Sequence, residues 1–244
     1  MSKSNGMAAK EFERTVKAAI RGPGFKEDSI KFKANGQFSR NRFLLSYQRD
    51  SLMPDPLKIF FPLCSDLGID VHELEQMLFL AQTVHFGYEP DGPTHKVYLE
   101  FLRNKNLDGN LMFLSLKTKD GQNILNSYTR MSKKSCRSLL AAVELAPAID
   151  EVISESIDVA IASGGDLLDV ADPAKDRRSI DISFAYMDLL VSDLPELDGL
   201  IAAYPFISDV LKPEMNKKLG HFAAGQGADG VPFFTIYYGA RVLA

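Results

Sequence analysis

Two segments of this chain share the pattern of a β-hairpin and lie in matching surroundings. Each has two strand-like runs around an Asp-Gly pair: residues 85–98 surround Asp91-Gly92, and residues 221–237 surround Asp229-Gly230. Asp-Gly between alternating apolar residues predicts a hairpin turn, because the turn needs a positive φ that glycine adopts without a Cβ clash. Strands joined by such a short turn must be antiparallel. The sequence therefore predicts a largely antiparallel sheet.

The same order of elements precedes both hairpins. An arginine opens a strand-like run 43 residues before the first histidine of each copy, and two helix-like segments follow that run. The pairs are Arg42 with His85 and Arg178 with His221. A repeated order of strand, helix, helix, strand, strand indicates duplication of one unit. We therefore expect one compact α+β domain made of two related units, residues 1–134 and residues 135–244.

Periodicity, caps and glycine or proline stops place the other elements. Helices are predicted for residues 8–21, 70–81, 135–144 and the first half of 148–162. Another is predicted from the Pro54 and Pro56 turn to Leu67, and two more begin at Asp193 and at Ser208. Strands are predicted for 42–47 and 180–184, and a further hairpin for 111–131 around Asp120-Gly121. The stretch 164–176 is rich in glycine and aspartate and is interpreted as an exposed connection. We expect the helices to flank the sheet.

Composition and charge exclude several classes of function. Apolar residues make up 45% of the 244 residues and the formal net charge is −4, so no general electrostatic attraction draws the chain to nucleic acid or an anionic membrane. No run reaches the roughly 18 apolar residues of a membrane helix, and residues 1–9 lack the apolar core of a signal peptide. Two cysteines, Cys64 and Cys136, cannot form a disulfide framework. We predict a soluble, cytoplasmic protein without nucleic-acid or membrane partners.

Each predicted strand has an apolar face and a polar face. Alternate residues put Val97 and Leu99 on one face and Lys96, Tyr98 and Glu100 on the other. The same alternation assigns Lys117, Thr235, Tyr237 and Arg241 to the polar face. Helices must cover the apolar face. The polar face either meets solvent, as in many antiparallel sheets, or lines the lumen of a closed barrel that holds a small organic ligand.

Two short patterns on these strands resemble a known family. Lys96-Val97-Tyr98 and Thr235-Ile236-Tyr237 are similar to strand segments of the aromatic prenyltransferases of the ABBA barrel type. The resemblance implies a ten-stranded antiparallel barrel, ringed by helices, that holds an aromatic acceptor. It also implies that Lys96 and Lys117 contact the diphosphate of a prenyl donor and that Tyr98 and Tyr237 shield the allylic cation. Arg241 is a further ligand candidate.

No motif predicts a metal, a cofactor or a nucleophile. The chain has no HExxH, no paired CxxC, no EF-hand loop and no GxSxG. His85 and His221 begin equivalent strands, but the four histidines have no metal-ligand spacing. The four aspartates of the stretch 164–176 are interpreted as a solvated acidic connection. We predict neither a metal nor a cofactor.

Two functions of different classes fit these patterns. The first is a soluble small-molecule-binding protein or transferase that uses a Tyr/Lys-lined sheet face or barrel lumen, with aromatic prenyl transfer as its sharpest form. The alternative is a non-catalytic interaction protein, such as a homodimer joined through a sheet face or edge. A closed barrel favours the first, and an open sheet favours the second.

Overall fold

The computed structural model describes residues 7–90, 95–102, 110–119, 122–142, 145–172, 177–227 and 229–243. They form two compact units. Unit 1 comprises Met1–Glu27, Asn41–Tyr128 and Arg241–Ala244, and unit 2 comprises Asp28–Arg40 and Thr129–Ala240. The chain thus passes between the units four times, and neither unit is a single continuous segment. The predicted division at residue 134 and the duplication behind it stay predictions.

Ten antiparallel strands form a closed barrel. They are β1 (Gly24–Lys33), β2 (Phe38–Gln48), β3 (Thr83–Tyr88), β4 (Lys96–Glu100), β5 (Leu111–Lys119), β6 (Gln122–Arg130), β7 (Leu167–Asp172), β8 (Arg177–Ser183), β9 (Leu219–Gln226) and β10 (Pro232–Val242). Their hydrogen-bonded order is β1-β10-β9-β8-β7-β6-β5-β4-β3-β2, closing on β1. The open, solvated sheet considered from the sequence is therefore wrong, and the predicted α+β class and closed barrel are confirmed.

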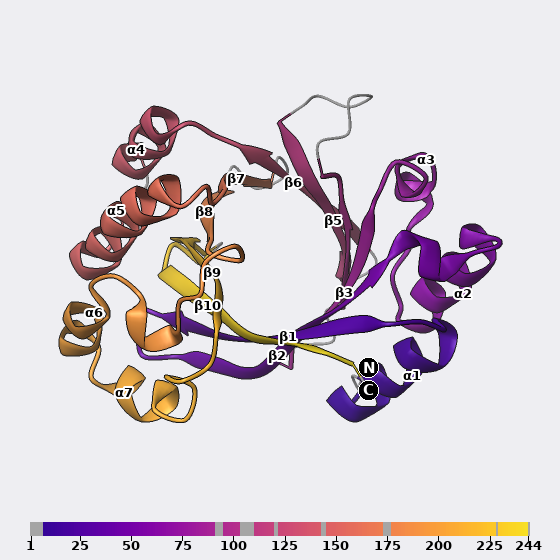
Figure 1. Ribbon diagram of the computed structural model, residues 1–244, viewed down its shortest axis with the longest axis horizontal. Coiled ribbons are helices and arrows are strands. Elements are labelled where there is room, and N and C mark those ends of the chain that lie inside the picture. The colour runs from indigo at the N-terminus through magenta and orange to yellow at the C-terminus, as the bar shows by residue number, and fades with distance from the viewer. Residues whose placement is uncertain are drawn as a thin grey trace. The chain divides into compact units, whose positions relative to one another are not determined.

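Helices lie on the outside of the strands in each unit (Figure 1). Unit 1 has α1 (Ala9–Ala19), the 3-10 turns Arg49–Leu52 and His72–Leu74, α2 (Pro56–Asp66) and α3 (Glu75–Leu78). Unit 2 has α4 (Lys133–Ala142), α5 (Pro147–Ala162), the 3-10 turn Val191–Asp193, α6 (Leu197–Ala203) and α7 (Phe206–Leu211). The order β2, α2, α3, β3, β4 recurs as β8, α6, α7, β9, β10.

The outer faces of the unit 1 strands form an apolar core with the helices. Phe43, Leu45 and Phe86 are at most 4% exposed and belong to one apolar cluster with Phe12 of α1 and Phe60 of α2. The Phe12 ring lies 5.8 Å from that of Phe43, edge to face. Period-two alternation on the strands and helical spacing on α1 therefore produce the apolar layer that the sequence predicts.

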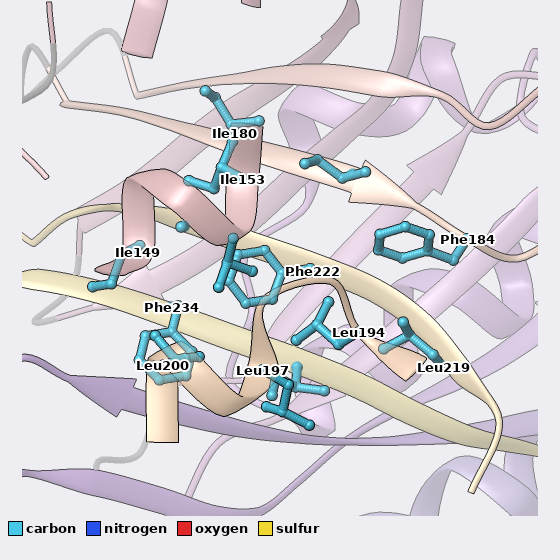
Figure 2. Packing of buried hydrophobic residues seen from close by; sticks show 14 of the residues in the cluster. Ile149, Ile153, Ile180, Phe184, Leu194, Leu197, Leu200, Leu219, Phe222 and Phe234 are labelled. Carbon is cyan, nitrogen blue, oxygen red and sulfur yellow. The ribbon is translucent and has the colours of Figure 1, made fainter. Parts of the chain in front are cut away.

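The core of unit 2 is built in the same way. Figure 2 shows Phe222 on β9 and Phe234 on β10 beside Leu197 and Leu200 of α6. The two phenylalanine rings stack with centroids 5.9 Å apart. Both side chains are at most 1% exposed, so they contribute fully to the apolar surface removed from water.

Several elements differ from their prediction. The stretch 164–176 contains the strand β7, which pairs with β8 from Leu167↔Ile182 to Asp172↔Arg177, so the exposed connection is wrong for residues 167–172. The helix predicted from Asp193 begins only at Leu197, because Glu196 has a positive φ of 55°. The helix predicted for 70–81 is a 3-10 turn followed by the single turn of α3. Helix α5 fills the whole of 147–162.

Glycine-containing turns join the strands. Gly230 has a φ of 74°, the left-handed conformation that the Asp229-Gly230 pair predicts. Gly36, with a φ of 89°, turns the chain between β1 and β2. Asp91-Gly92 and Asp120-Gly121 lie outside the described residues.

Candidate functional site

The polar residues of unit 1 lie on the inner, helix-free face of β2 to β5, in two adjacent rows. Cross-strand pairing aligns Ser46, His85, Tyr98 and Ser115 in one row. It aligns Leu44, Gly87, Lys96 and Lys117 in the next row. Neighbouring rows on one face are two residues, or about 7 Å, apart along a strand. The predicted residues Lys96, Tyr98 and Lys117 are thus brought together.

Three basic residues and one carboxylate lie in or next to the row of Lys96, and we call Arg42, Lys96 and Lys117 the cationic row. The Lys96 ammonium lies 2.6 Å from the Glu89 carboxylate, and the Arg42 guanidinium lies 2.7 Å from the same oxygen. Lys117 lies directly across from Lys96 on the next strand. Like charges in directly opposed positions repel each other, so this arrangement favours an anion between them.

Glu89 is held ionised by these neighbours. Burial alone would raise the pKa of its carboxyl, but the charges of Lys96 and Arg42, and the hydrogen bonds that they donate, outweigh burial and hold the pKa well below its usual range. Glu89 immediately follows β3 and was not among the predicted site residues. Its position in the sequence could have indicated it: Glu89 comes two residues after Gly87 and therefore continues the alternation that places Gly87 on the polar face of β3.

We expect Glu89 to make the stability of the protein depend on pH. Because its pKa is lower in the folded state, it contributes stability that is present above the unfolded pKa of about 4.3 and is lost as the pH falls through the folded pKa. Glu89→Gln removes this contribution. Urea unfolding from about pH 7 down to about pH 3 should then show a less steep loss of unfolding free energy in the variant than in the parent. Parallel curves for the two proteins would contradict the ion-pair assignment.

Four aromatic rings surround the row of Tyr98. The centroids of His85 and Tyr98 are 6.4 Å apart, those of Tyr98 and Tyr128 6.1 Å, those of Tyr128 and Phe113 5.7 Å, and those of Phe113 and His85 5.9 Å. All four contacts are edge-to-face or tilted, the arrangement that ring quadrupoles favour. We call these four residues the aromatic group. Tyr128 and Phe113 were not predicted, although each lies on the polar face of its strand by alternation.

His85 also makes two side-chain hydrogen bonds. Its Nδ1 lies 2.7 Å from the Ser46 hydroxyl, and its Nε2 lies 3.2 Å from the Glu100 carboxylate. The three side chains come from β2, β3 and β4. His85 and Glu100 are 14% and 16% exposed, so water screens their interaction only in part.

Unit 2 repeats this row with the same residue types. Pairing aligns Ser183, His221 and Tyr237, as it aligns Ser46, His85 and Tyr98 in unit 1. The rings of His221 and Tyr237 are 5.9 Å apart, edge to face. The carboxylate partner is Asp181, whose oxygen lies 2.8 Å from the Nδ1 of His221.

The two remaining predicted residues belong to β10. Tyr237 lies in unit 2 beside His221. Arg241 lies in unit 1, is exposed, and follows an irregularity between Tyr237 and Tyr238 that changes the register of β10. Simple alternation from Thr235 to Arg241 is therefore interrupted.

Among the residues that the structure describes, no group of three or more His, Cys, Asp or Glu side chains has an arrangement that could hold a metal ion. None of the helices in the described part of the chain combines the length and the hydropathy that a membrane span requires.

Solved structures with a similar fold identify its class. AnaPT from Neosartorya fischeri has a TM-score of 0.54 and 10% identity, over 87% of this chain and 77% of that chain. NotF prenyltransferase has a TM-score of 0.53 and 11% identity, over 87% and 80%, and NotF in complex with brevianamide F and DMSPP has 0.53 and 13%, over 87% and 79%. No protein-family model and no curated protein matches the chain. The chain therefore has the barrel fold of the ABBA-type aromatic prenyltransferases. At these identities the likeness concerns the fold alone.

Proposed function

We propose that this protein transfers a prenyl group from a prenyl diphosphate to an aromatic acceptor. The observation that carries the proposal is the position of a cationic row beside an aromatic group on the inner face of unit 1. The fold adds support, because one structure of similar fold is a complex with brevianamide F and DMSPP. A fold hosts many activities, so the proposal rests on the residues of the site.

The cationic residues are suited to the diphosphate. Arg42 and Lys96 are already paired with an oxygen anion, Glu89, at 2.7 and 2.6 Å, which is the geometry of a charge-assisted hydrogen bond. Lys117 lies across from Lys96. When the bond between the prenyl carbon and the diphosphate oxygen breaks, the electron pair goes to the diphosphate. The positive charges of these three side chains stabilise the negative charge that develops on the diphosphate.

The aromatic group is suited to the other product of that bond cleavage. The faces of Tyr98, Tyr128 and Phe113 attract a cation through their quadrupoles, and apolar rings keep water from capturing an allylic cation. A ring carbon of the acceptor then bonds to the prenyl carbon, and the acceptor loses its ring proton. Tyr237 as a second shield and Arg241 as a further diphosphate ligand stay predictions from the resemblance.

A thermal-shift panel tests the binding step. We expect dimethylallyl diphosphate, at about 100 times its dissociation constant, to add about 2.7 kcal/mol to the unfolding free energy and to raise the midpoint by several degrees. Inorganic pyrophosphate and indole are the comparison ligands. At equal ligand concentrations we expect the prenyl diphosphate to raise the unfolding midpoint more than pyrophosphate does, because only the prenyl diphosphate also contacts the aromatic group. No shift with any diphosphate would overturn the proposal and favour the interaction protein. The predicted homodimer, cytoplasmic location and lack of a cofactor stay predictions.

A further inference from the structure

We propose that Ser46, His85 and Glu100 form a proton relay that removes the ring proton of the aromatic acceptor. The inference rests on the proposed transferase function and assigns the step that the cationic row and the tyrosines leave open. After the prenyl carbon bonds to the acceptor ring, the ring carbon still carries its proton and a positive charge. A base must take that proton for the ring to become aromatic again.

The hydrogen bonds fix the direction of transfer. An ionised carboxylate only accepts, so the 3.2 Å contact between Glu100 and Nε2 requires a hydrogen on Nε2. In the neutral imidazole, Nδ1 then has no hydrogen and accepts from the Ser46 hydroxyl, 2.7 Å away. Neutral His85 is thus oriented as a base towards Ser46, by a carboxylate on its other nitrogen.

The same geometry also accommodates the product of the transfer. The acceptor gives its ring proton to the Ser46 oxygen while the hydroxyl hydrogen moves to Nδ1 of His85. The resulting imidazolium donates from both nitrogens, to Ser46 and to Glu100, in the positions that they already occupy. Glu100 keeps its negative charge beside the new cation, and the proton later leaves to water. No side chain has to move, so little reorganisation accompanies the step.

The relay also lies where the reacting ring has to be. Ser46 and His85 share a row with Tyr98, and the next row on the same strands carries Lys96 and Lys117. Rows are about 7 Å apart. This interval accommodates a prenyl carbon bonded to diphosphate and an acceptor ring in contact with that carbon. The His85 ring is itself in the aromatic group, 5.9 Å from Phe113.

Variants of the relay, assayed with the full chain, test this inference. The probes are dimethylallyl diphosphate with brevianamide F, indole or 1-naphthol, each also deuterated at its ring carbons. We expect His85→Ala to lower turnover by about 10²- to 10⁴-fold. Added imidazole should restore part of the turnover of this variant. Because proton removal becomes slow, the deuterated acceptor should react more slowly than the protiated one in the variant but not in the parent protein.

Ser156→Ala is the matched control. Ser156 lies on α5, outside the candidate site, and is fully buried, so this variant loses a buried serine hydroxyl without changing the relay. We expect Ser46→Ala and Glu100→Gln to lower turnover and Ser156→Ala to leave it unchanged, with dimethylallyl diphosphate affinity retained in all three. Turnover of His85→Ala equal to that of the parent, or no isotope effect and no rescue by imidazole, would overturn the relay and leave the transferase function intact. No product from the parent protein would overturn both.

Discussion

Replacing Lys96 by methionine should slow prenyl transfer by about 10²- to 10³-fold, the usual cost of removing one group that stabilises developing negative charge. Lys96 is central to the cationic row, because it is paired with Glu89 at 2.6 Å and lies opposite Lys117. Methionine keeps most of the side-chain volume and removes the charge. The rate of product formation at saturating dimethylallyl diphosphate measures the effect.

An exposed lysine supplies the control for this variant. Lys58 on α2 carries the same charge, is paired with Asp55 and is 83% exposed. Lys58→Met should turn over at the rate of the parent protein. Each variant loses one salt bridge, so both can lose some stability. If their unfolding midpoints are similar, a lower turnover of Lys96→Met reflects catalysis and not stability. Equal turnover in Lys96→Met and Lys58→Met would show that Lys96 does not bind the leaving group.

Phe222→Ala should reduce the free energy of unfolding by about 3–5 kcal/mol, the range for truncating a buried phenylalanine. Its ring is fully buried beside Phe234 in the core between the barrel strands and α6 (Figure 2). For a chain of this size the midpoint should fall by about 6–20 °C. Thermal unfolding followed by circular dichroism measures both quantities.

Phe79→Ala removes the same side chain from a position that is 49% exposed. We expect its unfolding free energy to stay within about 0.5 kcal/mol of the parent value. Phe222→Leu, which retains much of the buried volume, should lie between the two. A loss for Phe222→Ala as small as that for Phe79→Ala would mean that β9 does not pack against the helices as described.

The sequence predicted the strands with clear period-two alternation and the turn at Asp229-Gly230. Residues 96–100 alternate strictly, and both their pairing and their two faces are confirmed. The strand β7 was missed because Leu167–Asp172 contains two aspartates and follows Gly-Gly, a pattern typical of a loop. Its strand structure comes from pairing with β8, a long-range contact that local propensity does not contain.

The candidate site was predicted in part for the same reason. Alternation assigned Lys96, Lys117 and Tyr98 to one face, but only the register of the strands shows that Lys96 and Lys117 are directly opposed. Glu89 is separated from Arg42 by 47 residues, so nothing local indicated their ion pair. The relay partners of His85 likewise come from β2 and β4. Alternation predicts the face of the sheet on which a residue lies, whereas the strand register determines which residues of that face are neighbours.

Incubation of the purified protein with dimethylallyl diphosphate and the three aromatic acceptors tests the transferase proposal most directly. The reaction mixtures are analysed by mass spectrometry for an acceptor enlarged by one C₅H₈ unit, with release of pyrophosphate as the second readout. The account predicts both products with the parent protein, and about 10²- to 10³-fold slower formation of both with Lys96→Met at the same enzyme concentration. A protein that binds dimethylallyl diphosphate, yet forms no prenylated product with any of these acceptors, would contradict the proposed transfer to these aromatic acceptors.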